Sequence, residues 1–378
     1  MDPNTNNSIP YGQQNPSPGT VYENTHVIGE PRYHFSEPVG AFMDPEYLKE
    51  QRRKQLRRSI TKKRIRALGN GIGATLIGYV ACGYILPVIF VFLIPEFYDH
   101  YSRSATFSSA YGIFHSVINI LVPFLIFAFL RKKDDFNAGK VLRLPKDKFK
   151  STLLVFAGFF GCLASNYVVS IVQTIAQSFG ISTEYTALTH PKSDLDVILV
   201  IVSTAIVPPL IEELAFRGII LNSLQKYGNT FAIVCSALFF GVMHANPVQI
   251  PYAFLCGLFL GYITVASGSL WPAIAVHAIS NGLSATVDAV TYYHSEKTAE
   301  DIYTILFIFG IVIGLVSLIL YLVNYYKKDD VLENKKAIQP VVTEKTKYAS
   351  ILSSPVMIIA FIICFKLAWD YLKFDTVF

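Results

Sequence analysis

The stretch LDVILVIVSTAIVPPLIEELAFRGIILNSLQ, residues 195–225, is long and apolar enough to cross a membrane as a helix, yet three charged side chains stand close together in its second half. A helix needs about 20 mostly apolar residues to span a hydrocarbon core of about 30 Å. A charge at the centre of such a helix costs roughly 2.5 to 3.5 kcal/mol, so it is a functional candidate by default. The stretch therefore predicts a membrane helix that carries a polar site.

The chain on either side has the same apolar character. Of its 378 residues, 52% are hydrophobic and 16% are charged, whereas an ordinary soluble protein carries about 25% charged residues. We therefore expect an all-α fold, a polytopic membrane helix bundle of about eight or nine spans with a four-helix core. The candidate spans are about 68–95, 108–130, 151–179, 195–225, 230–246, 250–267, 271–291, 302–326 and 350–372.

The distribution of basic residues predicts the orientation. Residues 1–44 are rich in Asn, Pro, Gln and Ser and predict a disordered cytoplasmic tail, and the basic juxtamembrane segment 45–66 suits a helix on anionic headgroups. The loops 131–150 and 327–349 are rich in Lys and Arg. Because such residues stay in the cytoplasm, we expect a multi-pass plasma-membrane protein with its N-terminus inside and its C-terminus outside. One Lys or Arg stands in each of the remaining long loops, 96–107, 181–194 and 292–301.

Two counts exclude other classes. The net charge of +5 is small and scattered, so nucleic acid is not expected as a partner. The apolar spans make the lipid bilayer the expected partner. The cysteines all fall inside apolar blocks, which is typical of small buried residues and gives no disulfide framework or CxxC metal site. They are Cys82, Cys162, Cys235, Cys256 and Cys364.

The three charges within 195–225 are Glu212, Glu213 and Arg217. Glu213 and Arg217 are four residues apart with the acid first, the better order for an ion pair within a helix. Glu212 lies about 100° around the helix and is left without this partner. We therefore expect Arg217 to neutralise and fix Glu213 while Glu212 faces a cavity. The alternative is a buried ion pair that serves helix packing alone.

Two later histidines each have a companion one helical turn away on the same face. His244 follows Phe240, and Asn281 follows His277. Counted from the turn YGNT (227–230), Glu212 and His244 both lie on the order of 23 to 25 Å along their helices, so they share a level. The same arithmetic leaves His277 and Asn281 several ångströms nearer the cytoplasm on straight helices, a gap that prolines and tilt have room to close.

These residue types suit hydrolysis of a peptide bond without a nucleophilic Ser or Cys. Such a reaction needs an activated water, a base of suitable pKa and donors for the tetrahedral oxyanion. Glu212 and His244 can hold and deprotonate the water. His277 and the uncharged amide of Asn281 can donate to the oxyanion.

The order EExxxR (Glu212, Glu213, Arg217), FxxxH (Phe240, His244) and HxxxN (His277, Asn281) resembles the three-motif signature of the CPBP family, the CAAX-protease and bacteriocin-processing (Abi) intramembrane proteases. The resemblance covers residues 195–291 and implies that they form a four-helix catalytic core. N-terminal spans (67–194) are expected before this core and C-terminal spans (292–378) after it. It implies a glutamate-dependent intramembrane endopeptidase. Its catalytic residues are Glu212, His244, His277 and Asn281, with Glu213, Arg217 and Phe240 in support.

The implied substrate is a hydrophobic or membrane-bound peptide, and the eukaryotic branch of the family removes the last three residues of prenylated CaaX proteins. Members were first described as metalloproteases. The sequence has no HExxH zinc signature, yet Glu212, His244 and His277 could form a His2Glu zinc site, so we favour hydrolysis without a cofactor and leave zinc open. The competing functions are a proton-coupled transporter and a non-catalytic receptor or bacteriocin-immunity scaffold.

Overall fold

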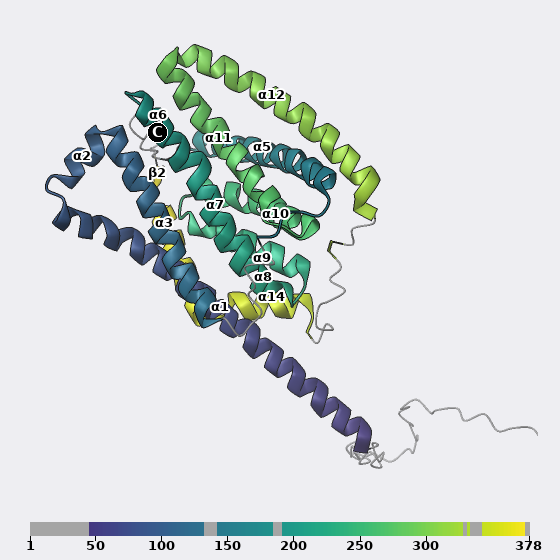
Figure 1. The fold of residues 1–378 in the computed structure, drawn as a ribbon. Helices are drawn as coiled ribbons and strands as arrows, with labels where there is room; N and C mark the ends of the chain where they lie inside the picture. The colour runs from purple at the N-terminus through teal and green to yellow at the C-terminus, as the bar shows by residue number, and fades with distance from the viewer. Residues whose placement is uncertain (1–44, 132–141, 184–190, 328–330, 333–341, 375–378) are drawn as a thin grey trace, which may run out of the picture. The chain divides into compact units, whose positions relative to one another are not determined.

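The structure is a computed structural model that describes residues 45–131, 142–183, 191–327, 331–332 and 342–374. Nearly all of these residues are helical, which confirms the all-α fold class (Figure 1). By its contacts the chain divides into residues 1–51 and 52–378, and the helix bundle lies in the second unit. The tail predicted at 1–44 lies outside the described residues.

The first helices are long and largely apolar. The basic segment 45–66 and the first expected span form one continuous helix, α1 (Pro45–Leu93). A short helix, α2 (Phe97–Arg103), leads to α3 (Ala105–Leu130), whose first turn is capped by the Ser104 hydroxyl. The next helix, α5 (Lys148–Ser178), is capped by the Asp147 carboxylate. Each cap accepts a backbone N–H that the helix itself leaves without a partner.

The stretch that holds the three charges is helical from Asp194 to Gln225 but changes its winding twice. It runs as α6 (Asp194–Ile201), the π-helical η2 (Val202–Ile206), α7 (Val207–Glu213), the π-helical η3 (Leu214–Leu221) and α8 (Asn222–Gln225). Short π segments inside α-helices occur frequently at functional sites. Here they fall on either side of the two glutamates, and they change which residues face a given side of the helix.

The buried centre of the bundle is α9 (Asn229–Met243), most of whose residues are buried. It contacts η3, α8, α10 (Gln249–Ser267), α14 (Glu344–Leu352) and α15 (Pro355–Asp370). Its close approach to α10 depends on Gly257, where an added Cβ would lie 2.9 Å from the Cα of Ala237. Small residues at such contacts let two membrane helices come together.

Two layers flank this centre. On one side α3 packs on α6, η2, α7 and η3. On the other side α5 packs on α10, on α11 (Trp271–Tyr293) and on α12 (Glu296–Tyr321), which continues as the π-helical η4 (Leu322–Tyr326). The four expected core helices, 194–225, α9, α10 and α11, are thus enclosed by α3 and α5 (Figure 1).

Fewer helices are long and apolar enough for a full crossing than the eight or nine spans expected. Among the described residues, six helices are long and apolar enough to cross a membrane, or seven if α14 and α15, bent by 69°, form one span. Helix α9 has only 15 residues. Helix α11 has 23, but polar side chains such as His277 and Asn281 lower its apolarity. The bend before α15 falls at Pro355, which cannot donate a backbone hydrogen bond to the preceding turn.

The connecting segments gather at two ends of the bundle. At one end Asp196 accepts from Thr106 and Asp194 accepts from Tyr293, so the three loops with few basic residues lie together. At the other end the Trp271 indole donates to the carbonyl of Leu142, in the basic loop. The grouping agrees with the expected topology.

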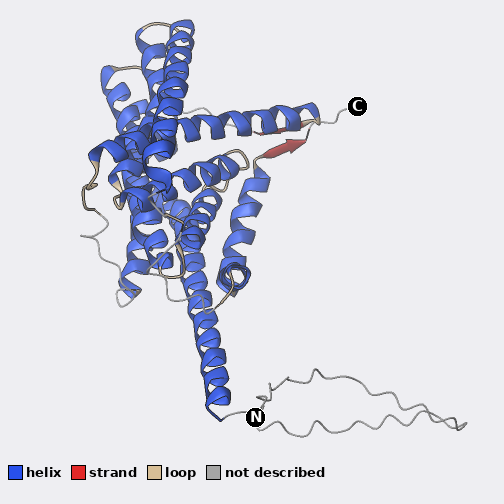
Figure 2. Cartoon of the chain, turned by 90° about the vertical axis from the view of Figure 1, so that its right-hand side faces the viewer, coloured by secondary structure: helices blue, strands red, loops and turns tan. Residues whose placement is uncertain are grey.

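One small sheet joins distant parts of the chain. Strand β1 (Ile181–Thr183) follows α5, and β2 (Leu372–Phe374) follows α15; they pair antiparallel with Ser182 opposite Lys373 (Figure 2). The pairing sets the end of α15 beside the 181–194 loop, where the expected topology puts the C-terminus. The sheet itself was not expected.

Candidate active site

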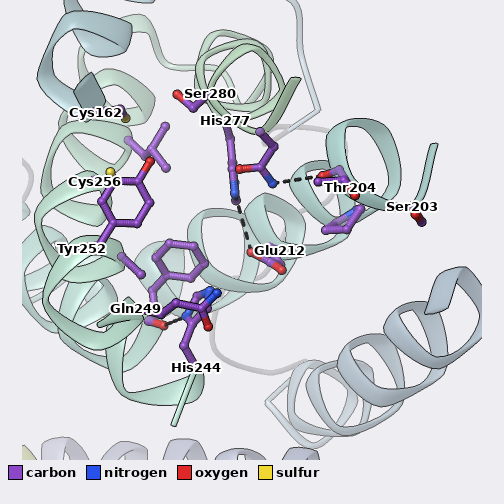
Figure 3. Close-up of a pocket in the computed structure, with 15 residues that line it drawn as sticks. Cys162, Ser203, Thr204, Glu212, His244, Gln249, Tyr252, Cys256, His277 and Ser280 are labelled. Atoms are coloured by element: carbon purple, nitrogen blue, oxygen red, sulfur yellow. Dashed lines mark hydrogen bonds and ion pairs between the residues drawn. The ribbon is translucent and has the colours of Figure 1, made fainter. Parts of the chain in front are cut away.

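The expected site residues surround one cavity of about 290 Å³ between the helices of the core (Figure 3). Its lining comes from α5, the helix 194–225, α9, α10, α11 and the turn that precedes α10. Five of the seven expected residues line it, namely Glu212, Phe240, His244, His277 and Asn281. The two that do not, Glu213 and Arg217, are buried directly behind it.

The Glu213 carboxylate joins two helices behind the cavity. Its Oε1 accepts from Arg217 Nη1 at 2.8 Å, with both side chains fully buried, and lies 3.0 Å from Nδ1 of His277. The predicted ion pair between Glu213 and Arg217 is thus confirmed. Arg217 also donates through Nη2 to the carbonyl of Gly257, at 3.2 Å. A single buried carboxylate therefore fixes the ring of His277 on α11 and ties it, through Arg217, to α10.

Glu212 faces the cavity as expected, but its nearest imidazole is not the expected one. Its Oε2 lies 3.8 Å from Nε2 of His277, and the side chains of Glu212 and His277 are only 13% and 12% exposed. At 3.8 Å the two groups are too far apart for a direct hydrogen bond and suitably placed for a bridging water. Because Nδ1 of His277 is occupied by Glu213, the ring presents Nε2 to Glu212.

His244 reaches the same cavity from the end of α9. Its Nδ1 lies 2.8 Å from the carbonyl oxygen of Phe240, one turn earlier, so this nitrogen carries the proton that it donates and Nε2 is left for the cavity. No hydrogen bond joins His244 to Glu212 among the described residues, although both line the cavity. His244 thus lies across the cavity from Glu212 without direct contact.

Phe240 separates the charged groups. Its ring lies 4.4 Å from the guanidinium carbon of Arg217 and meets the rings of His244 and His277 nearly edge-on, with centroids 5.0 and 5.8 Å away. A cation over a ring face and rings at right angles are both favourable contacts. The side chain therefore holds Arg217 behind the cavity and sets the spacing of the two imidazoles.

Asn281 is held by a backbone carbonyl that two prolines leave free. Its Nδ2 donates to the carbonyl oxygen of Thr204 in η2, at 3.0 Å. That oxygen would accept from residue 208 in an α-helix or from residue 209 in a π-helix, and both are proline, without an N–H. The dipeptide Pro208–Pro209 therefore leaves an acceptor that only another helix can satisfy, and Asn281 satisfies it while keeping one N–H for the cavity.

The structure closes the gap that straight helices leave between Glu212 and His277. Sequence arithmetic sets His277 several ångströms nearer the cytoplasm, whereas the structure places it within 3.0 Å of Glu213. The estimate assumes 1.5 Å per residue throughout, and the π segments η2 and η3 do not follow it. The proline pair Pro208–Pro209 is the feature of the sequence that indicates a departure from regular α-helical geometry.

A second wall of the cavity escaped the sequence reasoning. Helix α10 contributes Gln249, Tyr252 and Cys256, and α5 contributes Cys162 (Figure 3). Gln249, Tyr252 and Cys256 follow the i, i+3, i+7 spacing of one helix face. No charge marks that face, and sequence reasoning assigned it no role in the site.

The residues of the zinc alternative, Glu212, His244 and His277, do not converge as a metal site. Within the described part of the chain, no three His, Cys, Asp or Glu side chains are grouped so that they could hold a metal ion. Nδ1 of His277 is engaged by Glu213 and Nδ1 of His244 by a carbonyl, which leaves Nε2 of each ring as the nitrogen that could face a metal. A zinc ion would have to draw Glu212 and His244 toward each other across the cavity.

Comparison with known proteins gives two matches. The family model described as Type II CAAX prenyl endopeptidase Rce1-like matches residues 194–283, the part of the chain that holds all three motifs. The curated Bacillus subtilis (strain 168) protein named "Putative membrane peptidase YdiL" is 29% identical over 136 residues, which are 35% of this chain and 54% of that protein. The chain therefore spans about half the length of this relative.

No solved structure matches the chain significantly. The matched segment runs from the first residue of α6 into α11 and so contributes all seven of the expected site residues. Over residues 194–283, the segment that holds all three motifs, the chain is therefore similar to the CAAX prenyl endopeptidases.

Proposed function

We propose that this protein is an intramembrane endopeptidase that hydrolyses a peptide bond in a hydrophobic or membrane-associated peptide, lipid-modified peptides included. The single observation that carries the proposal is the position of Glu212. Its carboxylate faces the cavity with Nε2 of His277 3.8 Å away, while the neighbouring carboxylate of Glu213 is fully buried in an ion pair. One acid is thus available for chemistry and the other is committed to structure.

In the proposed reaction Glu212 takes a proton from a water in the cavity. His244, on the far side, holds that water through Nε2, and the water oxygen attacks the carbonyl carbon of the substrate. The oxyanion that forms accepts from Asn281 and from His277 when its Nε2 is protonated. Glu212 then returns the proton to the leaving amine. General acid–base catalysis of this kind typically raises the rate by a factor of about 10² to 10⁴. Stabilisation of the oxyanion contributes a further factor of about 10² to 10³.

The buried groups give this site its rigidity. Glu213 fixes the ring of His277, and Arg217 keeps Glu213 charged without solvent. A carboxylate without such a partner would be costly to bury. The proposal therefore gives Glu213, Arg217 and Phe240 a positioning role, with no contact to the reacting atoms.

The substrate is proposed from the lining of the cavity. About 290 Å³ is room for a short peptide segment, and the cavity is bounded by apolar as well as polar side chains within helices apolar enough for a membrane. A peptide anchored in the bilayer would reach such a site by lateral movement. We propose the plasma membrane, with a cytoplasmic N-terminus, as the location, on the strength of the basic loops.

The test is cleavage of a panel of hydrophobic and lipid-modified peptides by purified protein, with Glu212→Gln beside the native enzyme. We expect Glu212→Gln to lose about 10² to 10⁴-fold in kcat, since the amide cannot take a proton. Glu300→Gln is the matched control, because Glu300 is exposed on α12, and it is expected to keep full activity. Undiminished turnover by Glu212→Gln would refute the role of this residue.

Two further arms separate the alternatives. Cleavage is measured with and without a chelator. Loss of cleavage in the chelator, with recovery when zinc is added back, would favour a zinc-dependent mechanism over the metal-free one. Proton flux in liposomes that is independent of peptide and lost in Glu212→Gln would favour a transporter. In vivo protection against a bacteriocin that survives loss of Glu212, His244 and His277 together would favour a non-catalytic scaffold.

A further inference from the structure

The wall of the cavity that carries no charge contains two thiols from different helices. Cys162 on α5 and Cys256 on α10 both line the cavity and are only 2% and 5% exposed (Figure 3). The two side chains interact with each other where α5 packs on α10. Both belong to the same cluster of buried residues, in which α5 and α10 pack against each other. The proposed reaction uses neither thiol.

The surroundings of the two thiols are polar for a packing contact inside a membrane bundle. The phenol of Tyr252 and the hydroxyl of Ser165 lie within side-chain hydrogen-bond reach of Cys256. The hydroxyl of Ser280, which also lines the cavity, interacts with Cys162. The pair also belongs to a hydrophobic cluster that includes Leu260 and Val276, so it lies where the polar and the apolar lining meet. Here the pair faces the same cavity as Glu212.

We propose that Cys162 and Cys256 form a covalent modification site, a dithiol that low-molecular-weight disulfides convert to an internal disulfide between α5 and α10. The inference goes beyond the proposed function, since the bond can form whether or not the protein is a peptidase. Cys162 and Cys256 are the two described cysteines that line the cavity, so a reagent that enters there meets these two thiols together.

The reaction is two successive thiol–disulfide exchanges. The thiolate of one cysteine attacks a sulfur of the reagent, forms a mixed disulfide and releases one reagent thiolate. The thiolate of the other cysteine attacks the protein sulfur of that mixed disulfide and releases the second reagent thiolate. The two protons lost by Cys162 and Cys256 end on the two released thiols. The protein thiols are oxidised and the reagent disulfide is reduced.

Formation of the disulfide would affect the charged wall of the cavity by displacing the backbone of α10. A disulfide draws its sulfur atoms to about 2.05 Å, much closer than two thiols in contact. Cys256 precedes Gly257, whose carbonyl accepts from Arg217 at 3.2 Å, and Arg217 holds the Glu213 that fixes His277. Gly257 itself has no spare room, since an added Cβ would lie 2.9 Å from Ala237. A shift of α10 at this point is therefore passed to the ring of His277.

The experiment treats the purified full-length protein with 2-hydroxyethyl disulfide and counts free thiols by maleimide labelling in denaturant, with peptide mapping by mass spectrometry. From five cysteines in the native chain, we expect two to be lost, in one peptide pair that joins Cys162 to Cys256. Cys162→Ser and Cys256→Ser should form no internal pair. Cys235→Ser is the matched control, because Cys235 is equally buried on α9 but does not line the cavity, and it should still form the pair.

The thiol count stands apart from peptidase activity, so failure of the proposed function leaves this test intact. Where cleavage is measured, the oxidised native protein is expected to lose about 10²-fold in rate and to recover it with a dithiol reductant, since a displacement of about 1 Å can cost this much. Cys162→Ala is a second variant should Cys162→Ser fold poorly. Loss of two thiols in both single variants, or no loss in native protein while a model dithiol peptide is oxidised, would overturn the proposal.

Discussion

The two walls of the cavity are built from different chemistry. The wall made by α7 and α11 carries Glu212 and His277, and behind it Glu213 and, in η3, Arg217 hold the ring of His277 in one buried network. The wall made by α5 and α10 carries thiols, a phenol and an amide, with no formal charge among them. Buried charges keep their place only when each has a partner, so the first wall has little freedom to vary. Under the proposed function, the first wall would carry the reaction chemistry and the second would contact the substrate.

The largest expected effect is loss of the buried cation on the charged wall. Arg217→Met leaves Glu213 buried without a countercharge, which costs about 3 to 5 kcal/mol in comparable buried pairs. We expect a fall in thermal stability in detergent together with loss of cleavage. The measurement is the unfolding midpoint of the purified variant.

The control for this prediction is Arg103→Met, which removes an ion pair with Asp99 at the surface, where the arginine side chain is 79% exposed. Such pairs are worth about 0 to 1 kcal/mol. The double variant Glu213→Gln with Arg217→Met should regain stability but not activity. Native-like stability in Arg217→Met alone would show that the network does not hold the wall together.

An intermediate effect is expected where the proline pair meets Asn281. Asn281→Leu leaves the carbonyl of Thr204 unpaired, at a cost of about 1 to 3 kcal/mol. Adding Pro208→Ala supplies an N–H that this carbonyl can accept, so about 0.5 to 1.5 kcal/mol of stability should return. Activity should stay low in both variants, because the amide is missing from the cavity.

This coupling is read from a double-mutant cycle of unfolding free energies. Pro251→Ala is the matched control for Pro208→Ala, since Pro251 lies in the first turn of α10, away from Thr204. The same gain from Pro251→Ala in the Asn281→Leu background would remove the argument that the prolines create the acceptor.

The smallest effect is expected on the uncharged wall. Tyr252→Phe removes a hydroxyl that lines the cavity but keeps the ring, and we expect kcat to change less than about threefold, since no general acid–base step depends on it. KM for different peptides is expected to change more than kcat. A loss as large as that of Glu212→Gln would mean that the two walls share the chemistry.

Sequence reasoning predicted the charged wall better than the uncharged one. The spacing of Glu213 and Arg217 predicts their ion pair, because residues four apart on a helix must be neighbours. The helical membrane architecture follows from apolar length alone. Both inferences rest on periodicity within one segment, and the structure confirms both.

The parts that depend on how segments meet were not predictable in the same way. The contact of His277 with the glutamates required the winding of the helix 194–225, which the sequence indicates only through Pro208 and Pro209. The thiol wall gave no signal, because Cys256 and Cys162 are individually indistinguishable from packing residues. Among the described residues, fewer helices than the eight or nine expected spans are long and apolar enough for a crossing, because α9 is short and α11 is polar.

The pairing of β1 with β2 has a consequence for the order of assembly. The two strands lie on the order of 190 residues apart, and long-range contacts of this kind form late because the intervening chain must first be ordered. Every helix from α6 to α15 lies between the two strands in the chain. The three-residue ladder can therefore form only after all of these helices, and with them the candidate peptidase domain, have been synthesised.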